Sequence, residues 1–275
     1  MNRLSLNQKT VNSCSLPEAV AACVRAGITS IGVWREPLHE FGVQAGAALL
    51  ADAGLRVSSL CRGGFFTAPD RDEVLADNRR AIDETAALDA DCLVLVVGGL
   101  PPGSRDLAAA RAGVADVLAR LVPYAADRGV RLALEPMHPI YAADRGVLST
   151  LGQALDLAER HDPAVVGVVV DTFHVWWDPD LERQVARAAD RIASFQVCDW
   201  ITPLPADALL ARGMMGDGHI DFRHIAGLVA AAGYTGDVEV EIFNADVWRE
   251  DPDTVVATVV RAFAEHVSAA ATSSR

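Results

Sequence analysis

Three carboxylates and one amide lie at the ends of apolar segments in the second half of the chain. Glu135 closes the segment VRLALE, Asp171 closes AVVGVVVD, and Glu241 lies near the end of DVEVEIF. Gln196 lies inside IASFQVCD, the apolar segment between the last two of these. Because carboxylate and amide oxygens suit hard divalent cations, this set favours Mg²⁺ or Mn²⁺ over Zn²⁺.

The apolar segments that carry these residues are predicted to be strands of a parallel sheet, buried on both faces. The C-terminal ends of parallel strands meet at one edge of the sheet, where ligands bind in α/β folds. Carboxylates gathered there would repel one another and be costly to bury, and a divalent cation removes both problems. The alternative is that each residue acts separately, paired with an arginine or capping a helix.

Strand-like and helix-like segments alternate along the whole chain. Strands are expected at Leu4–Gln8, Ile28–Trp34, Arg56–Cys61, Cys92–Val97, Val130–Glu135, Ala164–Asp171, Ile192–Asp199 and Asp237–Phe243. Helices are expected at Ser15–Gly27, Val43–Ala53, Asp70–Leu88, Asp106–Arg128, Thr150–His161, after Asp178 with Pro179 at the first helical position, at Phe222–Ala232 and from Asp251 to His266. Eight such units in 275 residues favour one closed α/β barrel, (β/α)₈, over an open doubly wound sheet.

The chain is expected to form a single domain. No linker or change of composition divides it, so the barrel is predicted to occupy residues 1–268, with 269–275 as a frayed C-terminal tail. No GxGxxG follows the first predicted strand and no GxxxxGK[ST] occurs, which disfavours dinucleotide-binding and P-loop folds.

The overall charge disfavours several classes of partner. A formal net charge of −13 repels phosphate backbones and anionic membranes, so we expect no nucleic-acid and no membrane partner. The N-terminus lacks a signal-peptide core, and no apolar run is long enough to span a bilayer. Five cysteines without a CxxC pair are typical of a reduced, cytoplasmic protein, although a nucleophile at Cys61 or Cys198 is a weaker alternative. A homo-oligomer is left open.

The chemistry-bearing segments resemble a known family when they are taken together. They are LEP at Glu135, VDTFH at Asp171 and His174, FQVCD at Gln196, RGMMGDGHID, and VEVEIF at Glu241. This set resembles the sugar phosphate isomerase/epimerase superfamily, the xylose-isomerase-like TIM barrels. Ketose 3-epimerases, inosose isomerases and dehydratases, hydroxypyruvate isomerases and endonuclease IV belong to it. The resemblance covers the whole barrel and is sharpest from residue 135 to residue 243.

The resemblance implies that one divalent metal is bound by Glu135, Asp171, Gln196 and Glu241. It also implies that the two glutamates serve as the catalytic acid and base, and that His174 and Arg212 hold substrate oxygens. Most members have histidine where this chain has Gln196, whereas hydroxypyruvate isomerases and some dehydroshikimate dehydratases have glutamine. Mn²⁺ or Mg²⁺ is therefore expected, with Co²⁺ and Zn²⁺ left open.

Further residues are candidates for substrate binding, each with a structural alternative. Arg62 directly follows the third predicted strand and could bind a carboxylate or phosphate, or pair with Glu135 or a loop acid. Trp34 and Trp176 could wall the pocket or belong to the core or a lid. His138 is a substrate contact or an ordinary loop histidine. The GMMGDG turn is a mobile gate, a phosphate cradle or a plain turn.

The function expected from these features is isomerisation or epimerisation of a small polyhydroxy ketone or aldehyde. A metal would stabilise the enediolate, and the glutamates would move the proton. The first alternative is a lyase, which expels a β-hydroxyl or glycosyl group from the same enediolate. The second is a non-catalytic or partner-dependent barrel that retains the metal site. Endonuclease IV chemistry is disfavoured by the net charge and by the few histidines on the predicted strands.

Overall fold

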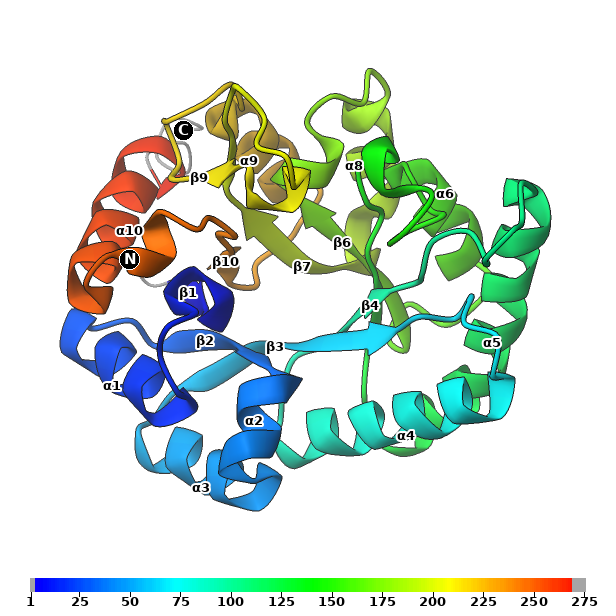
Figure 1. The fold of residues 1–275 in the computed structure, drawn as a ribbon, viewed down its shortest axis with the longest axis horizontal. Helices are drawn as coiled ribbons and strands as arrows, with labels where there is room; N and C mark the ends of the chain where they lie inside the picture. Colours follow the sequence, from blue (N-terminus) through cyan, green and yellow to red (C-terminus); the bar gives the residue numbers. More distant parts are fainter. Residues whose placement is uncertain (1–2, 269–275) are drawn as a thin grey trace.

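Eight parallel strands close into a barrel that is surrounded by helices (Figure 1). The structure is a computed structural model that describes residues 3–268, so the predicted tail 269–275 lies outside the described residues. The order around the barrel is β1-β2-β3-β4-β5-β6-β7-β10, and β10 pairs with β1. The barrel strands are β1 (Leu4–Asn7), β2 (Ser30–Trp34), β3 (Arg56–Gly64), β4 (Leu93–Val96), β5 (Leu132–Leu134), β6 (Val166–Asp171), β7 (Ile192–Val197) and β10 (Val238–Val240). The predicted (β/α)₈ barrel is confirmed.

Helices fill the connections between the strands and form the outer ring. They are α1 (Leu16–Ala26), α2 (Arg35–Phe41), α3 (Val43–Asp52), α4 (Arg71–Ala87), α5 (Leu107–Asp127), α6 (Leu151–Ala158), α7 (Thr172–Val175), α8 (Leu181–Ala188), α9 (Phe222–Ala231) and α10 (Pro252–His266). The sequence reasoning missed the short helices α2 and α7. Both begin directly after a strand, where an apolar run conceals the change of period.

Two boundaries differ from the prediction for identifiable reasons. Helix α8 begins at Leu181 rather than at Pro179, because the Asp178 carboxylate accepts the backbone N–H of Asp180 and forms a turn first. Strand β3 continues through Arg62 to Gly64, so Arg62 lies inside the strand and not after it. A Cβ at Gly64 would lie 2.0 Å from the Val96 carbonyl oxygen. Glycine at this position therefore permits close strand pairing.

A small antiparallel hairpin adds to the C-terminal side of the barrel. Strand β7 ends at Val197, and Asp199 belongs instead to β8 (Asp199–Trp200), which pairs with β9 (Arg212–Gly213). The prediction of one continuous strand through Asp199 is therefore wrong. This hairpin holds Arg212 over the barrel mouth, close to the ends of β6 and β10.

The core has an outer apolar part and a more polar inner part. Leu, Ile and Val side chains pack between strands and helices, as expected for a barrel of this kind. Inside the barrel, a small apolar cluster that includes Trp34, Cys61 and Phe243 lies beside buried polar side chains such as Asn7 and Glu239. The interior polar residues lead towards the mouth at the C-terminal ends of the strands.

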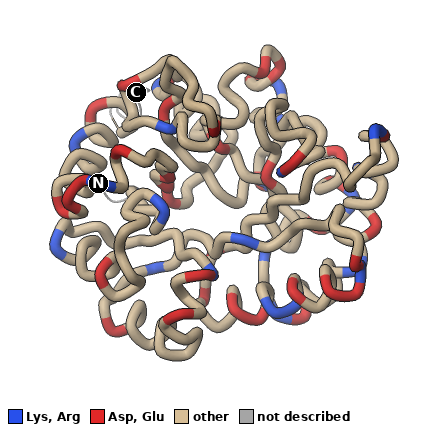
Figure 2. The backbone as a smooth tube through the Cα atoms, viewed as in Figure 1, with Lys and Arg blue, Asp and Glu red and all other residues tan. Residues whose placement is uncertain are grey.

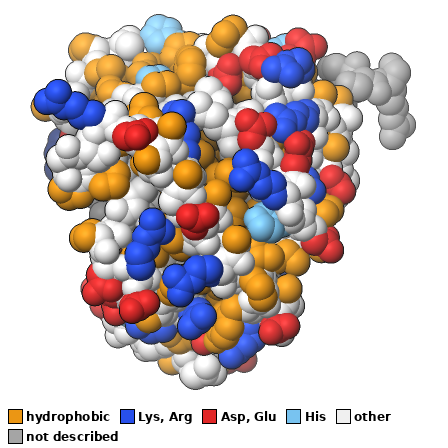
Figure 3. Space-filling view, turned by 90° about the vertical axis from the view of Figure 1, so that its right-hand side faces the viewer, with side chains coloured by type: hydrophobic (Ala, Val, Ile, Leu, Met, Phe, Trp, Pro, Cys, Tyr) orange, Lys and Arg blue, Asp and Glu red, His pale blue; other side chains and the backbone are white. Residues whose placement is uncertain are grey.

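Charged residues of both signs are spread over the outer helices, with further charged positions among the strands (Figure 2). On the flank seen in Figure 3, hydrophobic side chains are scattered among acidic and basic ones. No helix within residues 3–268 is long and apolar enough to cross a membrane.

Candidate active site

Three buried carboxylates converge at the mouth of the barrel. Glu135 directly follows β5, Asp171 is the last residue of β6, and Glu241 directly follows β10. Their exposed fractions are 5%, 1% and 4%. The backbone N–H groups of Glu135 and Glu241 still donate to the neighbouring strands, which fixes both residues at the barrel edge. The fold thus brings together the three carboxylates that the sequence singled out.

Arg212 is the cation that contacts this cluster. Its Nη1 lies 2.9 Å from Asp171 Oδ2 and 3.0 Å from Glu241 Oε2. Burial raises the pKa of Glu135 well above its usual range, and the neighbouring Glu241 and Asp171 raise it further. Burial raises the pKa of Glu241 to about 8, although Arg212 opposes this shift. One guanidinium therefore compensates the three carboxylates only in part.

His174 completes the cluster from α7. Its side chain is fully buried, and its Nε2 lies 3.7 Å from both Glu135 Oε1 and Asp171 Oδ2. Burial, helped by Arg212, lowers the pKa of His174 well below its usual range, so the ring is neutral. Its Nδ1 accepts the backbone N–H of His138 at 3.1 Å, which assigns the ring hydrogen to Nε2.

Arg212 is incompletely satisfied in this arrangement. Its Nη2 lies 3.1 Å from His174 Nε2, so two hydrogen-bond donors face each other. Its Nε is buried and has no hydrogen-bond partner within residues 3–268. A ligand oxygen between Arg212 and His174 would satisfy both side chains.

The two polar atoms of the Gln196 side-chain amide differ in their hydrogen bonding. The Nε2 group donates to Glu239 Oε1 at 3.1 Å. The Oε1 atom is buried, and no donor in the described part of the chain reaches it. Gln196 is paired in register with Asp171 on the neighbouring strand. An unpartnered buried carbonyl oxygen suits a cation, so this donor set fits the divalent metal that the sequence suggests.

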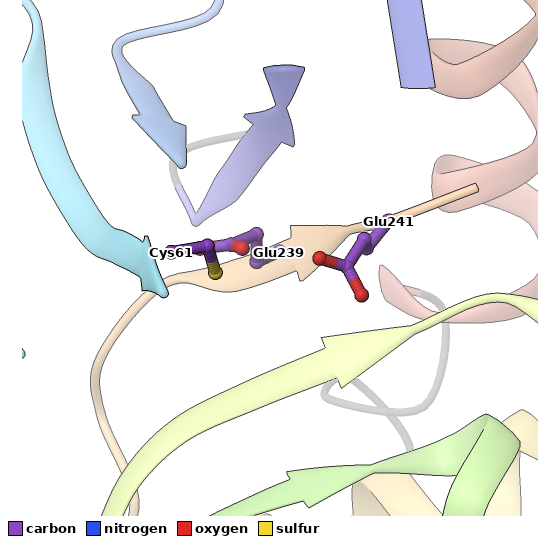
Figure 4. Close-up of side chains that lie close together, drawn as sticks. All are labelled: Cys61, Glu239 and Glu241. Carbon is purple, nitrogen blue, oxygen red and sulfur yellow. The ribbon is translucent and has the colours of Figure 1, made fainter. Parts of the chain in front are cut away.

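Glu239 is a buried residue of the site that the sequence reasoning missed. Figure 4 shows it on β10 beside Glu241, with Cys61 close by, and the three side chains offer ligand atoms within 4.8 Å of one another. The Glu239 carboxylate accepts hydrogen bonds from four side chains: Asn7, Ser58, Ser59 and Gln196. Alternation in VEVEIF was the available signal, because residues two apart share one face of a strand.

Glu239 fills space that a glycine leaves open. A Cβ at Gly32 would lie 2.5 Å from Glu239 Oε1. Asn7 Nδ2 donates to Glu239 at 2.6 Å and to Glu241 at 3.0 Å, so it links the inner carboxylate to the one at the mouth. Because Gln196 also donates to it, Glu239 fixes the orientation of the Gln196 amide. The hydrogen bonds of the Glu239 carboxylate are already complete.

The two cysteines considered as nucleophiles are both buried beside this cluster. Burial raises the pKa of the Cys61 and Cys198 thiols well above the usual value, with added repulsion from Glu241 at both. The thiolate form is therefore disfavoured, and neither cysteine is set up as a nucleophile.

A cavity of about 170 Å³ opens above the cluster. This is smaller than the roughly 300–1,000 Å³ typical of pockets for drug-sized ligands, so the cavity suits a small molecule. Of the candidate residues, Trp34, Arg62, Glu135, His174, Arg212 and Glu241 line it. Lys9, Arg145 and Phe243 also line it and were missed, because nothing in their local sequence marks them.

Four candidate residues do not line the cavity: Asp171 and Gln196, which were predicted as metal ligands, and Trp176 and His138, which were predicted to bind substrate. Trp176 packs against Trp200, with ring centroids 5.8 Å apart. The His138 ring packs against Trp177 and Trp200, and its backbone N–H orients His174. His138 thus acts on the site through its backbone.

The GMMGDG turn is folded around a carboxylate of the protein itself. Asp199 accepts the backbone N–H groups of Gly216, Gly218 and Ile220 at 2.8–3.0 Å. Of the readings considered for this turn, the phosphate cradle is therefore disfavoured, because Asp199 already occupies the N–H groups that an anion would need.

Residues 20–266 match the model of the xylose isomerase-like TIM barrel family. The chain belongs to this family. The match extends through nearly the whole barrel described above, and it confirms the resemblance inferred from the motifs around Glu135, Asp171 and Glu241.

Named relatives in the family catalyse more than one kind of reaction. A 3-dehydroshikimate dehydratase from Pseudomonas aeruginosa is 30% identical over 251 residues, which cover 87% of this chain. The chain spans only 38% of the length of that dehydratase. An L-ribulose 3-epimerase from Methylomonas sp. (strain DH-1) is 24% identical, over 84% of this chain and 79% of the epimerase.

Solved structures share the fold closely. A protein from Sinorhizobium meliloti 1021 is 48% identical, with a TM-score of 0.93 over 96% of this chain and 98% of that one. The IolI protein, solved with a bound zinc atom, has a TM-score of 0.84 at 20% identity, over 97% of this chain and 98% of that one. At that identity the likeness concerns the fold alone.

Proposed function

We propose that this protein is a divalent-metal-dependent isomerase or epimerase of a small polyhydroxy ketone or aldehyde. The observation that carries the proposal is the pair of buried glutamates, Glu135 and Glu241, which line a small cavity from opposite ends of an arc of strands. The relatives named as ketose and ribulose 3-epimerases support the same class of reaction.

The residues suited to hold the metal are Glu135, Asp171, Gln196 and Glu241. Three of them are incompletely compensated carboxylates, and the fourth has a buried oxygen without a partner. A divalent cation bound there would acidify the C–H next to the substrate carbonyl and stabilise the negative charge that develops on deprotonation. Mn²⁺ or Mg²⁺ suits an all-oxygen set, and the zinc in the IolI protein keeps Zn²⁺ open.

Glu135 and Glu241 are proposed to move the proton. They belong to β5 and β10, which are three strands apart around the barrel, so they approach a bound substrate from different sides. One carboxylate removes the proton from one face of the substrate, and the other returns it on the opposite face. Return of the proton to the same carbon would invert that stereocentre.

Arg212 and His174 are proposed to hold the substrate oxygens. Arg212 Nε has no partner in the described chain, and the Nε2–H of His174 faces another donor. A carbonyl or hydroxyl oxygen accepting from both would relieve this opposition. Trp34 and Phe243, which pack edge to face at 5.6 Å, supply the apolar wall of the cavity.

A lyase is the second candidate. The 30% identity to a 3-dehydroshikimate dehydratase favours it, and its first step is the same proton removal. The outcomes diverge afterwards, because a lyase expels a hydroxyl or glycosyl group from the β-carbon where an isomerase returns a proton. In that reaction the second glutamate would protonate the leaving group.

The test is a screen of ketoses, inososes and 3-keto-glycosides in D₂O with added Mn²⁺. The proposal predicts metal-dependent incorporation of deuterium next to the carbonyl and a product of unchanged composition. Loss of water or of an aglycone would identify a lyase instead. If the protein binds the metal but exchanges no proton in any of these substrates, both the isomerase and the lyase proposals are contradicted. A non-catalytic barrel would then be indicated.

A further inference from the structure

We infer that the substrate of this cavity carries an anionic group, a carboxylate or a phosphate, bound by Arg62 and Arg145. The inference rests on the proposed function for the site and extends it by naming the class of substrate. It starts from a contrast in charge. The whole chain has a net charge of −13, yet four cationic side chains, Lys9, Arg62, Arg145 and Arg212, line the cavity.

Arg212 is already engaged by carboxylates, whereas Arg62 is not. The Arg62 guanidinium forms no ion pair with any carboxylate within residues 3–268. It lies 4.5 Å from the Phe65 ring centroid and 5.7 Å from that of Trp34, so aromatic rings hold it in the cavity wall. An arginine held over aromatic rings keeps its N–H donors free for a planar anion.

Arg145 reaches the same part of the cavity from the loop that follows β5. Its Nε is buried without a hydrogen-bond partner among the described residues, and the nearest carboxylate oxygen, on Asp144, is 3.7 Å away. Both arginines line the cavity; burial lowers the pKa of Arg62, Glu36 opposes this shift, and Arg145 adds to it. Two neighbouring cations that repel each other are stabilised when an anion binds between them.

The other charged residues on the cavity wall do not neutralise the positive charge of Arg62 and Arg145. Lys9 Nζ lies 4.7 Å from the Trp34 ring centroid, donates to the neutral Asn12 side chain, and forms no ion pair within residues 3–268. Glu36 also lines the cavity, but it is exposed and forms no ion pair with Arg62. Glu135 and Glu241 belong to the cluster at the bottom. The outer part of the cavity therefore carries an excess of positive charge.

This arrangement indicates which group the substrate carries at each end. The carbonyl end lies at Glu135, Glu241 and Arg212, and the anionic end lies towards Arg62 and Arg145. A sugar acid, a hydroxylated keto acid or a sugar phosphate fits this pattern, whereas a neutral ketose leaves Arg62 without an ion pair in the described chain and Arg145 with only the 3.7 Å contact to Asp144. A paired buried arginine and anion make a strong, orienting contact.

The experiment uses three four-carbon polyols that have no ketone or aldehyde group and cannot be turned over. They are erythronate, erythritol 4-phosphate and erythritol, and their binding to the wild-type chain is measured by calorimetry with and without Mn²⁺. At least one of the two anions should bind about tenfold or more tightly than erythritol, and which one does so distinguishes carboxylate from phosphate. Because no turnover is needed, the result is independent of whether the proposed reaction occurs.

Arg62→Gln and Arg145→Gln should each reduce the preference for the anion by about tenfold and leave erythritol binding unchanged. Arg183→Gln, which removes an exposed arginine on α8, is the matched control and should have no effect. Circular dichroism checks that each variant is folded. The inference is overturned if neither anion is preferred by the wild type, or if the preference survives in both cavity variants.

Discussion

Glu135 and Glu241, the two glutamates at the barrel mouth, are each proposed to hold a cation and to move a proton. Both are buried, and burial raises the pKa of each. Asp171 differs from them because its carboxylate also accepts the backbone N–H of Phe173 at the start of α7. Its role is therefore expected to be that of a ligand alone.

Glu135→Gln and Glu241→Gln are predicted to lower turnover by about 10²–10⁴-fold while much of the metal affinity remains. The reason is that an amide oxygen can still bind a cation but cannot take up a proton. Asp171→Asn should act mainly through loss of metal. Turnover and Mn²⁺ affinity are measured on the same samples. Recovery of near-normal turnover in either glutamine variant with excess metal would show that glutamate to be only a ligand.

Gln196→Leu is predicted to weaken metal binding by at least about tenfold, because the buried Oε1 is lost. Gln196→His should retain the metal and shift the preference towards Co²⁺ or Zn²⁺, since imidazole suits these ions. Titration with each metal measures both effects. Unchanged affinity in Gln196→Leu would mean that the amide supports the site without contacting the metal.

At the scale of elements, apolar periodicity was enough to predict the barrel strands. The carboxylates at 135, 171 and 241 could be assigned to the mouth because the C-terminal ends of parallel strands share one edge. The ends of the strands were harder to predict. Gly63 and Gly64, for example, allow close strand pairing and so extend β3 beyond its predicted end at Cys61. Lys9 and Arg145 could not be predicted, because only the closed barrel brings their loops to the cavity.

The β8–β9 hairpin depends on one buried carboxylate. Asp199 accepts four backbone N–H groups, those of Trp200, Gly216, Gly218 and Ile220, and so ties the loop after β9 to β8. The same hairpin presents Arg212 to the cluster. The position of Arg212 is therefore coupled to the hydrogen bonds of Asp199.

Asp199→Ala is predicted to destabilise the protein by about 1–3 kcal/mol, because four backbone N–H groups, those of Trp200 and Ile220 being buried, lose their acceptor. Substrate binding should weaken as Arg212 becomes less well positioned. Chemical denaturation gives the first quantity, and hydrogen exchange at Gly216, Gly218 and Ile220 should accelerate. Slow exchange at these amides in the variant would contradict the role assigned to Asp199. Ala substitution of the exposed Asp246 is the control.

At the scale of the whole molecule, an acidic chain closes around a mouth that four cationic side chains line together with three glutamates. The carboxylates gather at the strand ends, and Arg62 and Arg145 line the outer wall. The folded state without metal must bury the carboxylate charge or keep it protonated. Its stability should therefore depend on pH.

The metal-free protein is predicted to lose stability as the pH rises from about 4.3, the pKa of an unfolded glutamate, to about 8, the raised pKa of Glu241. In this window the folded state holds a proton that the unfolded state has released, so unfolding becomes easier with increasing pH. Denaturation curves of the wild type and Glu241→Gln measure the effect. The stability difference between them should change across the window, and a constant difference would refute the prediction.

The central claim is that Glu135, Asp171, Gln196 and Glu241 together hold one divalent cation. The most direct measurement is a crystal structure of the protein grown with Mn²⁺, in which anomalous scattering locates the metal. The account predicts a single strong peak at the barrel mouth, within bonding distance of oxygens from all four residues. A peak elsewhere, no peak with Mn²⁺ present, or a Gln196 oxygen turned away from the metal would contradict it.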